Sequence, residues 1–453
     1  MSTEQRSTAP GPRRSFRRTL AAMIAVLVVL CTGLAVLTLG QGPRLVRSDI
    51  DTESVVQLTQ QRLLMHSNEP LAEIDVEQVS VTPSIPLKVA TDGSTLSITF
   101  EQRLLYGTDY VVSVSGVTSP FQEAGSTFDY SFTTGSPPLY YLQKGGPDAA
   151  AGADDAIVRT TVSGAARDVV YSAPRIQDFA VVGSSLAIVT ETDDGMSQLV
   201  LVAPGQSAVE TLPLPTRGTI TQLGSSVKQA MLGFRFTSAD PAAGYSNTLL
   251  LFDLLAKHTS FTLPGTVIGE PLEVDQWRFI PDSTLIETTA GGVMSIYDSA
   301  LQQGAVIGDY DGLGEVAPTG TQSVISGQGT FHMLDLLSGQ VSPLTPILPE
   351  GATAVGPPLL GPDGSTTVSV VNVAGVDGVM RQVVVRSDTS GATVVFDTAS
   401  ADARIVSVTQ SPNTQYLAIA VQPRPGAEIA TSLVDRSSGA AVRTLAGLRV
   451  TWP

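Results

Sequence analysis

Alternation of apolar and polar residues dominates the chain after its first sixty positions. Leu96, Ile98 and Phe100 fall on one side of an extended segment, and the alternation recurs at 110–114 and 128–132. This period of two is typical of half-buried antiparallel strands. No window past residue 66 keeps the 3.6-residue period of an amphipathic helix. We therefore predict that residues 44–453 form an all-β structure.

One earlier stretch breaks this pattern. Residues 21–39 form an unbroken apolar run, and no charged residue occurs between Arg18 and Arg44. A helix of about 20 apolar residues spans the ~30 Å hydrocarbon core of a bilayer. We therefore predict a single transmembrane helix over 19–42.

The charges on either side of this run predict its orientation. Residues 1–18 contain five arginines and one glutamate, whereas Arg44 and Arg47 are followed at once by Asp49, Asp51 and Glu53. Cationic flanks stay in the cytoplasm. We expect a cytoplasmic basic tail at 1–18, an uncleaved signal-anchor in the cell membrane, and an extracytoplasmic part after residue 42.

Other export signals fit the N-terminal region less well. A cleaved signal peptide has an apolar region of roughly 7–15 residues, which is shorter than the run at 21–39. Arg13-Arg14-Ser15-Phe16 is similar to the start of a twin-arginine signal, although the positive-inside rule alone explains these arginines. A lipoprotein signal would need a small residue before Cys31, where Leu30 stands. The signal-anchor is the preferred interpretation.

Residues 44–134 predict a β-sandwich. Asp92-Gly93 is a hairpin turn signal, and Tyr110 in LYGTDY fits the tyrosine corner of Greek-key sandwiches. The ordered segments resemble the bacterial Ig-like domains of surface-layer and cell-wall proteins, although the loop at 118–127 departs from their usual form. The resemblance implies a spacer or adhesive module. Its segments are LLMHSNEPL (63–71), VSVTPS (79–84), DGSTLSITF (92–100), LLYGTDYVVSVSGV (104–117) and YSFTTG (130–135).

After a linker at 135–138, two features repeat through 139–453 with a period of about 45 residues. One is a hairpin turn before an apolar strand, as at Pro362-Asp363-Gly364. The other is an apolar strand that ends in Asp before a turn, as in LLLFDLLAK (249–257). A repeat of 40–45 residues with about four short strands is typical of a β-propeller blade.

Counting these units predicts seven blades, with six or eight as alternatives. Three strands remain at the front, within 139–173, and one strand remains at the end, 448–452; together they would make the closing blade. Two segments, 359–371 and 408–421, resemble the Ser-Pro-Asp-Gly turn of TolB-like propellers. The six full units begin near residues 176, 219, 273, 312, 354 and 404.

The net charge limits the possible partners, and the cysteine content limits the possible cross-links. The whole chain has net charge −16 and residues 1–18 have +4, so the remainder has −20. Such a field disfavours nucleic acid as a partner. Cys31 is the only cysteine, which excludes an intrachain disulfide.

The sequence contains few motifs that suggest catalysis or metal binding. His66, His258 and His332 are unpaired, and Asp309-Tyr310-Asp311-Gly312 with Glu315 is an incomplete calcium loop. Ser225 and Lys228 have the Ser-x-x-Lys spacing, but in a predicted hairpin, whereas that chemistry needs a helix. We therefore predict no catalytic residues, no metal site and no cofactor.

The predicted inner strands contain almost no acidic residues, which disfavours a glycosidase with paired carboxylates. Trp277-Arg278 is the one aromatic–cation pair among them, so these two residues are candidate binding residues, with simple packing of Trp277 as the alternative. The expected function is a membrane-anchored binding or scaffold protein for an envelope protein or glycan. An envelope glycan hydrolase or lyase, and a structural wall protein without a discrete ligand, remain alternatives.

Overall fold

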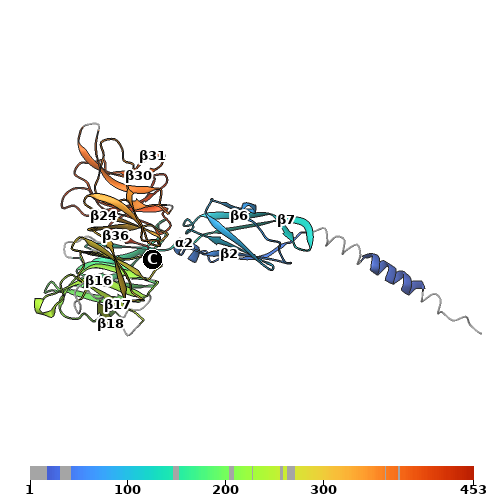
Figure 1. The fold of residues 1–453 in the computed structure, drawn as a ribbon, viewed down its shortest axis with the longest axis horizontal. Coiled ribbons are helices and arrows are strands. Elements are labelled where there is room, and N and C mark those ends of the chain that lie inside the picture. The colour runs from blue at the N-terminus through green and yellow to red at the C-terminus, as the bar shows by residue number, and fades with distance from the viewer. Residues whose placement is uncertain are drawn as a thin grey trace, which may run out of the picture. The chain divides into compact units, whose positions relative to one another are not determined.

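The computed structural model describes residues 18–30, 42–145, 153–203, 209–226, 228–255, 259–262, 271–362, 364–375 and 378–452. The chain divides into two compact units (Figure 1). The first holds the chain up to Val55 together with Gln60–Glu101 and Asp109–Thr133. The second holds Val56–Thr59, Gln102–Thr108 and the chain from Thr134 onward.

The predicted transmembrane segment is described only in part. Residues 18–30 are helical and their side chains are exposed, whereas residues 31–41 lie outside the described residues. Among the residues that the structure describes, no helix is long and apolar enough to cross a bilayer. The predicted anchor at 19–42 stays a prediction.

The first unit consists of two antiparallel sheets. One has the order β1 (Leu45–Asp49), β2 (Arg62–Ser67), β5 (Thr95–Phe100), β4 (Leu87–Asp92), and the other has β3 (Val79–Thr82), β6 (Asp109–Ser119), β7 (Gln122–Thr133). A four-residue helix, α2 (Ser54–Gln57), follows β1. The apolar positions of the alternating segments are buried, among them Leu96, Ile98 and Phe100. The predicted turn at Asp92-Gly93 joins β4 to β5, with Gly93 at φ +57°.

The second unit contains seven consecutive antiparallel sheets, here numbered one to seven. Sheet one has the order β10 (Arg167–Ala173), β9 (Asp155–Thr160), β8 (Leu139–Gln143), β36 (Leu448–Thr451). Sheet two is β11 (Ile176–Val182), β12 (Ser185–Glu191), β13 (Ser197–Val202), β14 (Val209–Leu212). Sheet three is β15 (Gly218–Ser226), β16 (Met231–Ser238), β17 (Thr248–Asp253), β18 (Thr259–Thr262). Sheet four is β19 (Gln276–Phe279), β20 (Leu285–Ala290), β21 (Val293–Asp298), β22 (Gln303–Gly308).

The last three sheets follow the same plan. Sheet five is β23 (Gly312–Val316), β24 (Gln322–Gly327), β25 (Thr330–Asp335), β26 (Val341–Leu344). In sheet six, β27 (Thr353–Ala354) and β28 (Leu359–Leu360) both pair with β29 (Thr367–Ala374), followed by β30 (Met380–Asp388) and β31 (Gly391–Asp397). Sheet seven is β32 (Arg404–Gln410), β33 (Tyr416–Gln422), β34 (Ala430–Asp435), β35 (Ala441–Leu445).

Buried apolar clusters join each sheet to the next. Sheets one and two share a cluster that includes Leu142 and Phe179, and similar clusters follow at every junction up to sheets six and seven. A seventh cluster joins sheet seven back to sheet one, through Leu433 and Tyr141. The seven sheets therefore close into a ring, which is the architecture of a β-propeller. Stacking buries the faces that one four-stranded sheet would leave exposed.

The ring is closed by both ends of the unit. The C-terminal strand β36 pairs with β8, with Leu448 opposite Leu142 and Thr451 opposite Tyr140. We call this junction, from sheet seven through β36 to β8, the seam. The number of sheets and this pairing agree with the sequence-based count of seven and with the predicted closing strand at 448–452.

The repeated Asp has a local cause. In five sheets the third strand ends in an aspartate whose Oδ1 accepts backbone N–H groups of the following turn, at Asp253, Asp298, Asp335, Asp388 and Asp435. An Asp side chain stabilises such a turn by imitating a backbone acceptor. Hydrogen bonds from Ser338 lower the pKa of Asp335.

If the ring is closed, packing at the seam should contribute as much to the free energy of unfolding as packing at any other junction. Leu433 at the seam and Leu232 between sheets two and three are both fully buried. We predict that Leu433→Ala and Leu232→Ala each lower the free energy of unfolding by about 2–5 kcal/mol, since each leaves a cavity. Urea unfolding measures both. A loss below about 1 kcal/mol for Leu433→Ala alone would indicate an open ring.

Candidate functional site

The inner strands of the ring are the first strand of sheets two to seven and β36 in sheet one. Each inner strand runs from one face of the ring to the other. We call the face where these strands begin, near Ile176 and Leu448, the start face, and the face where they end, near Pro318 and Asn413, the end face. The two faces differ in what covers them.

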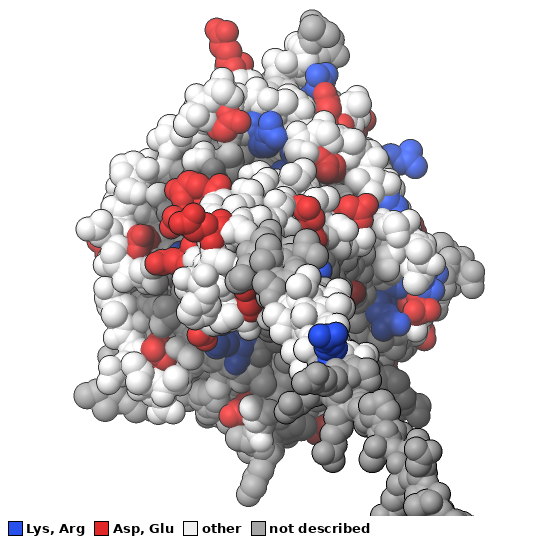
Figure 2. All heavy atoms as spheres, turned by 90° about the vertical axis from the view of Figure 1, so that its right-hand side faces the viewer, with Lys and Arg blue, Asp and Glu red and all other residues white. Residues whose placement is uncertain are grey.

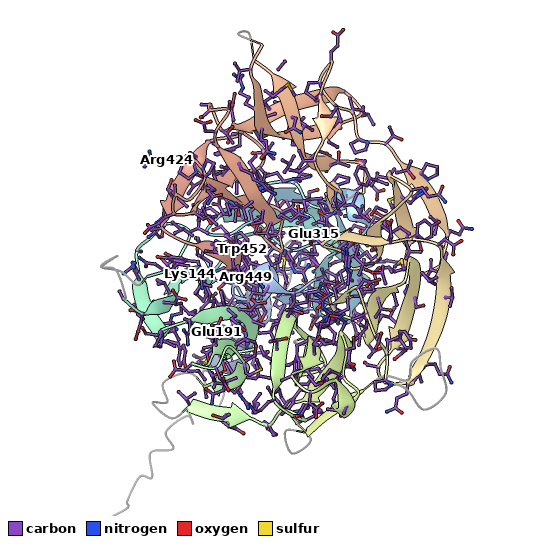
Figure 3. The ribbon with its side chains drawn as sticks, turned by 90° about the vertical axis from the view of Figure 1, so that its left-hand side faces the viewer. Lys144, Glu191, Glu315, Arg424, Arg449 and Trp452 are labelled. Carbon is purple, nitrogen blue, oxygen red and sulfur yellow. The ribbon has the colours of Figure 1, made fainter. Side chains whose placement is uncertain are left out.

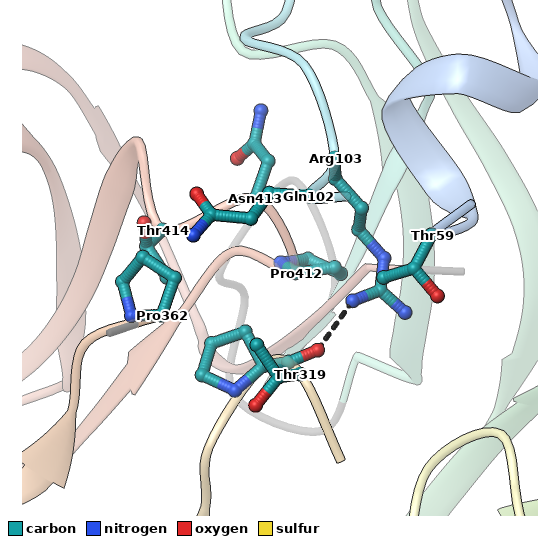
Figure 4. A pocket seen from close by; sticks show the side chains of 9 residues that line it. Thr59, Gln102, Arg103, Thr319, Pro362, Pro412, Asn413 and Thr414 are labelled. Carbon is teal, nitrogen blue, oxygen red and sulfur yellow. Dashed lines mark hydrogen bonds between the residues drawn. The ribbon is translucent and has the colours of Figure 1, made fainter. Parts of the chain in front are cut away.

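On the end face, residues 102–108 lie against the ring as part of the second unit; we call them the bracing segment. The Arg103 side chain is only 8% exposed. Its Nη1 donates to Pro318 O at 2.6 Å (Figure 4), and its Nη2 pairs with Asp282 at 3.0 Å. Its Nε donates to Gln57 O at 2.6 Å. Arg103 thereby ties the bracing segment to the turns that follow β19 and β23.

The other half of the bracing segment binds sheet seven. Asn413 Nδ2 donates to Leu104 O at 3.0 Å, and Tyr106 N donates to Gln415 Oε1 at 2.7 Å. The Tyr106 ring stacks on Tyr416 with centroids 6.3 Å apart, and burial raises the pKa of Tyr106.

The bracing segment therefore connects sheets four, five and seven at the end face. A cavity of about 20 Å³ remains there, lined by Thr59, Arg103, Pro362 and Asn413 among others (Figure 4). That space accommodates about one water molecule.

The start face carries charged groups beside the seam. Lys144 Nζ donates to Asp155 Oδ2 at 2.8 Å and to Ile176 O at 2.5 Å. Arg449 on β36 forms an ion pair with Asp178 on β11. Figure 3, which views the ring from one side, labels Lys144 and Arg449 near its inner strands.

Arg449 has an unusual backbone. Its φ is +56°, and the β36–β8 register shifts between Leu448 and Thr451. A bulge of this kind redirects a side chain, and such strain is frequent at functional positions. Here it accompanies an arginine that reaches across to sheet two.

A cleft of about 230 Å³, which we call the seam cleft, lies on the start face at the seam. Its polar lining consists of an ammonium group, two amides and a carboxylate, beside apolar side chains. The lining residues are Gln143, Lys144, Gln422, Ala427, Glu428, Ile429, Ala446, Gly447 and Leu448.

A second polar group lies on the first two strands of sheets four and five. Arg278 Nε pairs with Glu287 at 2.5 Å, and its Nη2 donates to Ser323 Oγ and to Val324 O. Glu287 is fully buried. Arg278 therefore links sheet four to sheet five through charge-assisted hydrogen bonds.

Glu315 on β23 belongs to the same group. Its side chain is accessible to solvent, yet protein surrounds it closely enough that burial raises its pKa, an effect that the positive charge of Arg278 partly offsets. Both properties fit a residue on an inner strand, and Figure 3 places its label near the middle of the ring. Glu315 is thus a carboxyl group that retains its proton to a higher pH than usual.

The two predicted binding residues point to opposite sides of β19, as neighbouring strand residues do. Trp277 is 7% exposed and packs between sheets three and four. A Cβ atom added at Gly233 would lie 2.3 Å from its ring, so the glycine makes room for the indole. Trp277 thus packs between two sheets, and contact of Trp277 or Arg278 with a ligand stays a prediction.

The histidines considered as possible metal ligands do not form a cluster in the described residues. His66 contacts Asp49 and Thr95 in the first unit, and His332 lies against Tyr310. His258 lies outside the described residues. Over the described ranges, no group of three or more His, Cys, Asp or Glu residues is placed to hold a metal ion.

The sequence analysis missed Arg103, Lys144 and Arg449. Lys144 directly follows the predicted strand 139–143, and Arg449 lies inside the predicted closing strand 448–452. The predicted pairing of those strands was a usable signal for the seam. No comparable signal exists for Arg103, whose partner Asp282 is 179 residues away.

The surface adds a diffuse negative charge. Figure 2 shows Asp and Glu side chains in groups and Lys and Arg more scattered on a largely uncharged face. This agrees with the net charge of −16.

No family model matches the chain, and no curated protein matches it. Similar solved structures include the β-propeller domain of the Trilobed protease from Pyrococcus furiosus, with 9% identity, a TM-score of 0.44 and coverage of 74% of this chain and 93% of that one. An oligogalacturonate lyase in complex with manganese has 9% identity and a TM-score of 0.44, and the match covers 84% of this chain and 94% of that one. A candidate 6-phosphogluconolactonase from Bacteroides fragilis has 12% identity and a TM-score of 0.42, and the match covers 68% of this chain and 93% of that one. The assignment of a ring rests on the sheets and clusters of this chain.

Removal of the Arg103 side chain tests the bracing segment. Arg103→Ala leaves buried acceptors without their charged donor, so we predict a loss of roughly 2–3 kcal/mol in the free energy of unfolding. Arg47→Ala is the control, because Arg47 is 70% exposed in its ion pair with Asp49 and such pairs contribute little. Urea unfolding compares them. Equal, small losses would contradict the bracing role.

The raised pKa of Glu315 makes the stability of the protein depend on pH. A carboxyl whose pKa is raised in the folded state stabilises it below the usual value of 4.5, and this contribution is lost as pH rises through the folded pKa. Glu315→Gln should therefore raise Tm at pH 7 by roughly 1–3 °C, allowing for screening by solvent at this exposed side chain, and leave Tm unchanged near pH 4. Glu123→Gln, at an exposed position, is the control in both thermal melts. A Tm that falls in Glu315→Gln at pH 7 would refute this account.

Proposed function

We propose that this chain is a membrane-anchored, extracytoplasmic binding protein of the bacterial cell envelope. In this proposal the apolar run anchors it with the N-terminus in the cytoplasm, the sandwich serves as an Ig-like spacer, and the propeller binds an envelope component. The observation that carries the binding role is the contrast between the two faces of the ring. The bracing segment covers the end face, whereas the start face carries the seam cleft.

The anchor is supported by the sequence and by one structural fact. The apolar run and its cationic flank predict insertion with the N-terminus inside. In the described helix at 18–30, apolar side chains such as Met23 and Val29 are exposed. A lipid environment would bury them.

The lining of the seam cleft favours a hydroxyl-rich ligand. Lys144 offers a donor with positive charge, Glu428 offers an acceptor, and the amide side chains of Gln143 and Gln422 offer polar surface. Sugar hydroxyl groups both donate and accept hydrogen bonds, so they suit such a mixed lining. Ile429 and Leu448 provide an apolar surface for the carbon face of a ring. We therefore place an envelope glycan ahead of a protein ligand.

One observation favours the alternative of a glycan hydrolase or lyase. Glu315 is an accessible carboxyl with a raised pKa, which is the property of a general acid. Hydrolysis in this manner needs a second carboxylate that substrate can reach. Glu287, the other acid of the Arg278 group, is fully buried and held by Arg278, so we rank binding above catalysis.

Binding is tested with the full-length chain in lipid nanodiscs and soluble fragments of envelope glycan. Lys144→Gln keeps a hydrogen-bond donor near Asp155 but removes the charge, and should weaken Kd about tenfold. Lys88→Gln, in an exposed ion pair of the first unit, should leave Kd unchanged. Calorimetry measures Kd, and Tm verifies folding. Equal affinities of both variants would exclude the seam cleft, and product release would favour the enzyme.

A further inference from the structure

The hairpin between β6 and β7 carries an exposed aromatic residue at its tip. The β6–β7 ladder extends to the pair Ser119–Gln122, and Pro120 and Phe121 form the turn. Phe121 is 82% exposed. The residues 119–127 contain no Lys or Arg, so the tip presents apolar surface without a positive charge.

This hairpin runs beside the point where the chain enters the first unit. Ser126 Oγ donates to Pro43 O at 2.5 Å, and a Cβ atom added at Gly42 would lie 2.5 Å from Ala124 O. A step back along the chain from Pro43 to Gly42 thus follows β7 from Ser126 toward Ala124. The next residues of the hairpin in this direction lead to Phe121. The tip therefore lies on the side of the first unit where the chain enters it at Gly42; Figure 1 shows β7 at this end of the sandwich.

The length of the intervening chain limits how far the tip can be from a membrane. The apolar run ends at residue 39, three positions before Gly42. Three extended residues cover about 10 Å. If the run spans a bilayer, Gly42 and the hairpin beside it lie within about that distance of the lipid surface.

We propose that Phe121, together with Pro120, inserts into the bilayer–water interface and fixes the first unit against the membrane. This inference rests on the proposed membrane anchor. Aromatic side chains favour the interfacial region. Because the anchor already holds the tip near the lipid at high effective concentration, a single aromatic contact suffices. The partner is the lipid itself, bound through apolar insertion, so the contact should not depend on anionic headgroups.

The test places a fluorophore beside the tip in the full-length chain. Cys31→Ser removes the only cysteine, and Pro120→Cys then carries an NBD label while Phe121 is retained. Val111→Cys is the matched control, because Val111 is 50% exposed on the same strand β6 and lies about 26 Å from Ser119 along it. Both proteins are reconstituted in phosphatidylcholine vesicles with or without nitroxide-labelled lipid.

We expect nitroxide lipid to quench the label at position 120 at least twofold and the label at position 111 little. Adding Phe121→Asp should abolish the quenching at 120. Equal quenching at both positions, none at 120, or no effect of Phe121→Asp would overturn the inference while the protein still floats with the vesicles. A protein that fails to float with the vesicles would instead refute the membrane anchor.

Discussion

The architecture depends on the pairing of β36 with β8. Each sheet of the ring covers its neighbours through a buried apolar cluster, but sheets one and seven become neighbours of each other only if the chain ends meet. β36 supplies the inner strand of sheet one, and Val450 contributes to the cluster that sheet one shares with sheet seven. Without this strand, two sheets would each expose an apolar face.

The same junction builds the candidate site. Lys144 directly follows β8, Arg449 lies on β36, and the seam cleft lies between sheets seven and one. The seam cleft therefore forms only when the ring closes. On the end face the bracing segment connects non-neighbouring sheets through Arg103 and Tyr106. The end face is thus braced, whereas the start face carries the seam cleft.

Much of the fold was predictable because it follows local rules. Alternation at residues such as Leu96 and Ile98 identified strands, and the recurrent Asp was visible because each copy caps the same turn. The repeat length then gave the number of sheets. The Ig-like identity of the first unit and the membrane placement remain proposals, since neither follows from sheet order alone.

The rest depends on contacts that leave no pattern along the chain. Arg103 pairs with Asp282 across 179 positions, and Glu315 is notable only for what surrounds it. Trp277 was a reasonable candidate as a rare aromatic beside a cation, but glycines at 224 and 233 let it pack between sheets. In sheet six, Pro357 and Pro358 separate the short strands β27 and β28, because proline donates no hydrogen bond to a ladder.

Native-state hydrogen exchange of the full-length protein tests ring closure most directly. If β36 and β8 complete the ring, their paired amides should exchange only through global unfolding of the second unit, with the same protection as those of β17. Exchange of the β36 amides at rates typical of a frayed terminus, while β17 stays protected, would contradict a closed ring and remove the basis of the site at the seam.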